Sequence, residues 1–395
     1  MAVFKSHYYK INLFYLKLLG LWPFDKKFVN KTKNVTIILL ITSLCIPQAI
    51  KLWEEWGKNA NIMLETSGSL MYFGMSQIKY MSCIRVQPKM KYLYEKIMRH
   101  WSTFSSQEDI NMLRECATIG RKLTIGYAVL VNVALTAYLS LPLVPVLLDV
   151  VKPLNETRPR VFPYFAEYFV DDQKYYFQLS VHGWVVCTIS AQLYVVFHTN
   201  CIQCAQHACG LFLCVEQRLQ RATAIATNKT FLSKTERDAK VYLNIVDAVH
   251  LHKEAIQCVN LMDDSFTLCY FVIVIFGTII ISFAAVVTLL RFEAGEMEQT
   301  IRFGGLYIGF TALLFVSMYP GQTIAESSAN VKNAVFHSNW FNTCPKSKQL
   351  IKIIMLRSSV PCQYTAGKLV TLNFESFGFV FKKSVSLVTI IASIR

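Results

Sequence analysis

The chain has 395 residues, of which 53% are hydrophobic and only 16% are charged. Soluble domains usually carry about a quarter charged residues, so this composition excludes an ordinary soluble protein and indicates a membrane protein with several spans. The net charge of +15 is spread in blocks between apolar segments. That pattern argues against a nucleic-acid-binding protein and is typical of membrane topology signals.

The N-terminal stretch carries seven lysines separated by short apolar runs. This pattern does not predict a cleavable signal peptide, whose apolar core follows a compact basic region. We expect residues 1–34 to form a cytosolic segment, with an interfacial helix at Tyr8–Leu21.

Seven apolar segments follow in chain order, and they lack the strict alternation of a β-barrel, so each is predicted to be a helix. The predicted spans are 35–53, 62–84, 123–149, 177–205, 265–290, 303–324 and 369–394. The chain shows neither inverted repeats nor broken helices, which argues against a secondary transporter. The sequence therefore predicts an all-α membrane protein with seven transmembrane helices.

Lysine and arginine are distributed unevenly between the segments that join these spans. The segments 1–34, 85–122, 206–264 and 325–368 carry six to eight each, against two to four in the segments between them. The positive-inside rule then predicts a cytosolic N-terminus and an extracellular C-terminus. A seven-span G-protein-coupled receptor has the opposite orientation.

Two glycosylation sequons fall on opposite sides in this topology. Asn155 lies in a loop placed outside, where it is a candidate glycosylation site, and Asn228 lies inside, where it could not be used.

Both long cytosolic segments mix apolar and charged residues at helical spacing. The apolar set in 236–262 comprises Val241, Ile245, Ala248, Val249, His252 and Ile256. This spacing predicts that the spans continue as helices into the cytosol and pack there, in a form suited to an oligomer interface; solvated loops are the alternative. The dipeptide Asp263-Asp264 just before the fifth span is interpreted as a solvated helix start.

Histidine and cysteine crowd one segment, which raises the possibility of a zinc site. The residues are His198, Cys201, Cys204, His207, Cys209 and Cys214. Structural zinc sites need spacings that fit turns, whereas this segment reads as one continuous helix, and buried thiols are common in helices. We therefore predict no metal and no cofactor. Catalytic motifs are also absent, so an enzyme is not expected.

Aromatic and small residues interleave in the outer halves of several spans. Examples are Tyr72-Phe73 in the second, Ala134 and Tyr138 in the third, and Tyr307 and Phe310 in the sixth. Packing between membrane helices explains any one of them. As a set they are also the residue types that line a pocket for a small apolar ligand.

The C-terminal region carries the most specific pattern. The stretches are YPGQTIAES from Tyr319, AVFHSNWF from Ala334, MLRS from Met355, TAGK from Thr365 and LNFESF from Leu372. Their order and spacing across roughly 315–390 resemble the C-terminus of insect odorant receptors. The predicted inverted topology extends the resemblance to the whole chain.

The resemblance implies an odorant-gated, non-selective cation channel in the plasma membrane of olfactory neuron dendrites, assembled as a heterotetramer with a shared coreceptor. It implies four regions: the N-terminal segment 1–34, a helix bundle 35–324 with an outer pocket and cytosolic extensions, an anchor segment 325–368, and a pore-lining last helix in 369–395. The implied ligand is a small volatile organic molecule. The implied pocket residues are Tyr72, Phe73, Ala134, Tyr138, His182, Val186, Ile189, Tyr307 and Phe310.

Two departures from the family pattern indicate which kind of subunit the chain resembles. The last span reads Ser384-Val385-Ser386-Leu387-Val388 where the family often has tyrosines. The coreceptor's long cytosolic insertion is absent, and so is the Thr-Tyr and Gln-Phe signature of the coreceptor and the gustatory receptors. The chain therefore resembles a tuning subunit, in the style of hymenopteran receptors.

Lys382 and Lys383 interrupt the last predicted span. A charge at the centre of a membrane helix costs about 2.5–3.5 kcal/mol unless it faces water or a partner. If this span lines a pore, both lysines, with Glu375 two turns earlier, mark a wet vestibule below an apolar gate at Val388 and Ile391. Snorkelling or burial against protein is the alternative. A homotetramer would place eight lysines around one pore and repel cations, so the lysines favour a heteromer.

Overall fold

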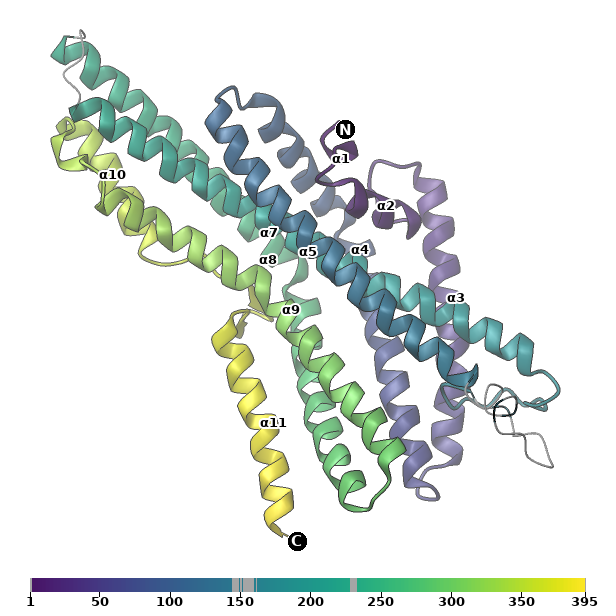
Figure 1. The fold of residues 1–395 in the computed structure, drawn as a ribbon. Coiled ribbons are helices and arrows are strands. Elements are labelled where there is room, and N and C mark those ends of the chain that lie inside the picture. The colour runs from purple at the N-terminus through teal and green to yellow at the C-terminus, as the bar shows by residue number, and fades with distance from the viewer. Residues whose placement is uncertain are drawn as a thin grey trace. The chain divides into compact units, whose positions relative to one another are not determined.

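A computed structural model describes residues 2–143, 149, 151, 160, 162–227 and 233–394, and these residues form helices almost throughout (Figure 1). The long helices are α3 (Lys27–Glu54), α4 (Ala60–Thr103), α5 (Gln107–Ser140), α7 (Tyr176–Thr227), α8 (Lys234–Glu293), α9 (Met297–Phe336) and α11 (Phe374–Ile394). The short elements are α1 (Ala2–Lys5), α2 (Lys10–Leu18), η1 (Leu141–Leu143), η2 (Trp340–Asn342), α10 (Pro345–Ser358), β1 (Thr365–Ala366) and β2 (Val370–Thr371). Asn155 and Asn228 lie outside the described residues.

The chain divides into two compact units. Unit 1 comprises residues 1–10, 88–122 and 200–395, and unit 2 comprises 11–87 and 123–199. Helices α4, α5 and α7 each contribute residues to both units.

Unit 2 has a core of apolar and aromatic side chains from α3, α4 and α7, in which Ile41, Phe73 and Val186 are buried. The hydroxyl of Tyr80 in α4 donates to the Leu19 carbonyl at 2.7 Å. The helix expected at Tyr8–Leu21 is present as α2, and Leu16 within it is buried. This segment therefore packs onto protein.

Unit 1 is built around α8 and α9, which lie side by side and are joined by a short turn (Figure 1). Helix α8 begins at a capping box, in which the Ser233 side chain accepts from the Glu236 N–H at 3.2 Å and the Glu236 side chain accepts from the Ser233 N–H at 3.0 Å. Helix α10 begins with Pro345, whose missing N–H would have no helical partner at that position.

The expected helical extensions beyond the spans are confirmed, since α7 continues to Thr227 and α8 starts at Lys234. Val241, Ile245, Ala248 and His252 form the buried stripe of this part of α8. Val249 and Ile256 are only half-buried, and Leu251 and Ala255 are buried in addition. The buried face is thus rotated slightly from the one that the apolar spacing predicts.

The interpretation of Asp263-Asp264 as a solvated helix start is wrong. Both residues lie inside α8, and Asp263 is only 7% exposed. Its burial results from packing against residues a hundred positions later in the chain, which helical periodicity cannot reveal.

The last helix begins at Phe374 and not at Leu369. Residues 365–371 form an antiparallel hairpin that pairs Thr365 with Thr371 and Ala366 with Val370. Its turn needs left-handed backbone, with φ of +65° at Gly367 and +58° at Lys368. The apolar composition of 369–373 alone does not separate this hairpin from the helix that follows it.

Among the residues that the structure describes, five helices are long and apolar enough to cross a membrane, by length and composition alone: α3, α5, α7, α8 and α9. The other two predicted spans lie in α4 and α11, which carry Lys79 and the Lys382–Lys383 pair.

Candidate ligand-binding and pore residues

The two aromatic residues predicted in the second span lie in the α4 part of unit 2. Tyr72 and Phe73 meet edge to face with ring centroids 5.3 Å apart. Phe73 is buried, whereas Tyr72 is half-buried and stacks on Tyr194 of α7 at 4.9 Å with an interplanar angle of 2°. The Tyr194 hydroxyl donates to the Tyr72 carbonyl at 3.2 Å. Tyr194 was missed because single aromatics in a long apolar helix look like ordinary core residues.

The predicted residues of α7 lie in unit 2. Val186 is fully buried, Ile189 is half-buried, and the His182 ring lies 2.8 Å from the Ser43 hydroxyl and 3.1 Å from the Tyr168 hydroxyl. Tyr168 belongs to the irregular segment before α7. His182 is therefore held by groups from two other parts of unit 2.

The two predicted residues of α5 differ in exposure. Tyr138 is half-buried and its hydroxyl donates to the Pro163 carbonyl at 2.7 Å, whereas Ala134 is exposed. The segment that contains Pro163 also sends Tyr164 against Gly183 of α7, where any side chain at 183 would collide with the Tyr164 ring. This segment, described from residue 162 onward, thus packs on both helices.

A polar cluster lies deeper in unit 2, near Tyr194. The ammonium of Lys79 is 3.2 Å from His198 Nε2 and 3.5 Å from the centroid of the Tyr194 ring. Lys79 is 1% exposed. A cation over an aromatic face is stabilised by the ring quadrupole, which helps a lysine to remain in an apolar bundle.

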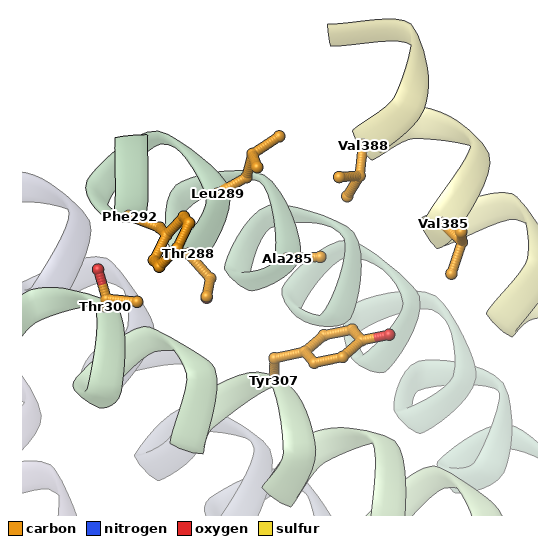
Figure 2. A pocket seen from close by; sticks show the side chains of 8 residues that line it. All are labelled: Ala285, Thr288, Leu289, Phe292, Thr300, Tyr307, Val385 and Val388. Atoms are coloured by element: carbon orange, nitrogen blue, oxygen red, sulfur yellow. The ribbon is translucent and has the colours of Figure 1, made fainter. Parts of the chain in front are cut away.

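In unit 1, Tyr307 lines a cavity of about 360 Å³ between α8, α9 and α11 (Figure 2). The lining residues are Ala285, Thr288, Leu289, Phe292, Thr300, Tyr307, Val385 and Val388. Figure 2 shows the Tyr307 ring and Val388 directed into this space from different helices. Phe310, one turn further along α9, is buried. The cavity thus contains one residue predicted for the ligand and one predicted for the gate.

Helix α11 has two different faces. Phe377, Ser384 and Val388 share the face turned toward α8 and α9, where Phe377 meets Phe315 of α9 at 5.3 Å and Ser384 is fully buried. The opposite face is polar and exposed in the single chain.

That exposed face carries Glu375, Lys382, Ser386 and Thr389, spaced by 7, 4 and 3 residues. Lys383 is exposed beside it, with its ammonium 5.5 Å from the Phe379 ring centroid. The side chain of Ile391 is outside the described part. Val388 is therefore separated from the lysine face by about half a turn.

The histidines of the α7 cluster engage other partners. His207 Nε2 lies 3.0 Å from His100 Nδ1, and His100 Nε2 lies 2.9 Å from Glu254 Oε2. Burial lowers the pKa of His100, although Glu254 acts in the opposite direction. Among the described residues, no group of three or more histidine, cysteine or acidic side chains is arranged to hold a metal ion.

Comparison with known sequences shows the family. The model of the 7tm odorant receptor family matches residues 64–385, so the chain belongs to that family. It is 24% identical over 154 residues to putative odorant receptor 59c of Drosophila melanogaster, and 21% identical over 100 residues to putative odorant receptor 69a, isoform A, of the same species. These matches cover 36% and 25% of the two relatives, and 38% and 25% of this chain.

Comparison with solved structures shows the fold. The insect olfactory receptor OR5 from Machilis hrabei superimposes with a TM-score of 0.74, and its complex with eugenol with 0.73. Each match covers 98% of this chain and 97% of the other at 14% identity. The predicted all-α membrane fold of the insect odorant receptor type is confirmed. The orientation of the termini and the roles of the site residues stay predictions.

Proposed function

We propose that the chain is a tuning subunit of a ligand-gated, non-selective cation channel that assembles with an odorant receptor coreceptor, as a tetramer, in the plasma membrane of olfactory neuron dendrites. The observation that carries the proposal is the fold match along nearly the whole chain to an insect olfactory receptor. Family membership and the lysine and arginine distribution favour this channel over a G-protein-coupled receptor.

The ligand in this proposal is a small, mostly apolar volatile molecule bound among Tyr72, Phe73, Ala134, Tyr138, His182, Val186 and Ile189 of unit 2. Tyr307 and Phe310 belong to unit 1, and their contribution to ligand binding stays a prediction. OR5 has been solved with eugenol, a small volatile phenol. The mixture of aromatic and aliphatic side chains with two hydrogen-bonding groups, Tyr138 and His182, supports a ligand of that size and polarity.

The test of function is current recording with the chain expressed alone and together with an insect coreceptor. We expect a panel of volatiles that begins with eugenol to evoke cation current only in the pair, with G-protein signalling blocked. Current from the chain alone would refute the heteromer. A response that disappears under the block would refute the channel.

The ligand site can be tested at Ile189, which is half-buried in α7. Removing part of an apolar contact costs about 1 kcal/mol, so Ile189→Ala should raise the EC50 about fivefold while the maximal current stays unchanged. Val181→Ala is the matched control, because Val181 is exposed on the same helix. An unchanged EC50 in Ile189→Ala would remove this residue from the site.

We also propose that the exposed face of α11, with Glu375, Lys382 and Lys383, lines the pore, and this can be tested at Lys382. A unit charge about 8 Å from a permeating cation in water costs about 0.5 kcal/mol, so Lys382→Gln should raise single-channel conductance about twofold. Lys352→Gln, at an exposed position of α10, should leave conductance unchanged. Equal conductance in parent and Lys382→Gln channels would show that this lysine lies away from the ion path.

A further inference from the structure

Residues 359–373 connect α10 to α11, and we call the part from 362 to 373 the connector. Its hairpin docks on a single turn of α8, residues 263–267, through both backbone and side-chain groups. The connector is the last part of the chain before the helix that we assign to the pore.

Asp263 is the centre of this docking. One carboxylate oxygen accepts from the Thr365 N–H and from the Thr365 hydroxyl, each at 2.7 Å. The other oxygen accepts from the Lys368 ammonium. A buried carboxylate needs several donors to offset its lost hydration, and here the hairpin supplies three.

Lys368 bridges the two neighbouring aspartates. Its ammonium also lies 2.9 Å from Asp264, whose side chain is 58% exposed. Hydrogen bonds to both carboxylates raise the pKa of Lys368 above its ordinary value. Asp263 and Asp264 therefore share one cation but differ in burial and in their bonds to Thr365.

The turn of the hairpin is fixed to the same stretch of α8. The Gly367 N–H donates to the Thr267 carbonyl at 2.8 Å, and the Lys368 N–H donates to the Thr267 hydroxyl at 3.1 Å. Any side chain at Gly367 would meet the Phe271 ring at 2.7 Å. The hairpin thus has little room to shift along α8.

The other side of the connector is held by α9. The Cys362 N–H donates to the Ser328 hydroxyl at 2.8 Å, and the Phe374 N–H donates to the Gln322 side chain at 3.1 Å. Phe374 also stacks on Phe315 at 4.9 Å. Beyond this point one face of α11 is exposed. The base of α11 is therefore fixed between α8 and α9.

We propose that Asp263 is a positioning residue of the channel, which locks the connector onto α8 and so gives α11 a fixed base about which it moves when the channel opens. The part of this inference that concerns opening rests on the proposed channel function. With a loose base, part of the displacement produced by the ligand would be absorbed in the connector.

Hydrogen–deuterium exchange tests the lock without any ligand, in the purified full-length chain assembled with coreceptor. In Asp263→Asn the amides of Thr365, Gly367 and Lys368 should exchange at least tenfold faster than in the parent. Lys368→Met, at a partly exposed position that should not impair folding, should accelerate them at least threefold. Asp264→Asn is the matched control and should change exchange less than twofold. Unchanged exchange in Asp263→Asn, or in Lys368→Met if the first variant fails to fold, overturns the proposal.

Current recording tests whether the lock affects channel opening. The channel is activated with the volatile phenol that evokes the largest current in a panel that begins with eugenol. Per receptor at the surface, the saturating current of Asp263→Asn should fall at least fivefold while the EC50 stays within twofold. A purely structural defect would lower current only in proportion to the surface amount, and that result would overturn the positioning role. A parent channel silent to the whole panel would instead count against the channel function, with the exchange data still deciding the lock.

Discussion

Replacing Gly321 by alanine should destabilise the receptor by about 3 kcal/mol and sharply reduce its amount at the cell surface. Gly321 lies in α9 where the connector crosses, and a Cβ at this position would lie 1.9 Å from the Leu372 carbonyl oxygen. The obstacle is backbone, and Leu372 is itself fixed by its N–H bond to the Tyr364 carbonyl at 2.8 Å. Overpacking of a fixed site typically costs about 1–3 kcal/mol or more.

The same helix provides a control. At Gly309 of α9 an added Cβ would meet no atom within 4 Å apart from its chain neighbours and the nearby backbone of its own helix. Alanine should be tolerated there, since it is the better helix former by about 1 kcal/mol. Thermal unfolding of the purified variants, monitored by size-exclusion chromatography, measures the stability of both Gly321→Ala and Gly309→Ala. A Gly321→Ala receptor as stable as Gly309→Ala would show that α9 and the connector do not approach so closely.

The sequence predicts well what depends on local periodicity. The helical extension through 236–262 and the continuous helix around Cys201–Cys214 both follow from apolar spacing, and both are present. Lysine and arginine counts give a topology that the structure leaves untested. These features are predictable because each is determined by residues within a few turns of one another.

Contacts between distant residues could not be predicted in this way. Asp263 meets Thr365 and Lys368 across about a hundred positions, so it looked like a solvated helix end. The Lys79–His198 contact could not be predicted for the same reason, because each residue in the sequence is only a polar residue within an apolar helix. A hydropathy profile identifies polar residues within apolar helices, but it does not show which of them contact one another.

The sequence predicts only in part which residues of the last helix share a face. Glu375 and Lys382 were correctly expected near one face, since they are seven residues apart. Val388 was assigned to a gate from its apolar character, but it lies in the cavity with Tyr307. Apolar residues are suited equally to a dry constriction and to packing against a neighbouring helix, and only the arrangement of α8 and α9 separates these possibilities. Its gate role stays a prediction.

Replacing Asp109 by alanine should strongly destabilise the part of unit 1 outside the predicted spans. Its carboxylate is 4% exposed and accepts from Arg218 Nε at 3.1 Å and Arg218 Nη2 at 2.8 Å, while Arg221 Nη2 lies 3.5 Å from its other oxygen. It also occupies the first turn of α5, where the helix dipole favours a negative charge. Asp109→Ala would remove the carboxylate partner of Arg218 and one of the two carboxylate partners of Arg221. Loss of one partner from a buried pair typically costs about 3–5 kcal/mol.

Glu108 supplies the matched control, since it pairs with the same Arg221 from a side chain that is 58% exposed. Exposed pairs contribute about 0–1 kcal/mol, so Glu108→Ala should unfold near the parent temperature. The weakened site in Asp109→Ala lies where α5 meets α7 in unit 1 and includes none of the proposed ligand residues. Its current should therefore fall in proportion to surface amount, with the EC50 unchanged. Equal thermal stability of the two variants would mean that the arginines find other partners when Asp109 is lost, and an altered EC50 would mean that this end of α5 and α7 communicates with the ligand site.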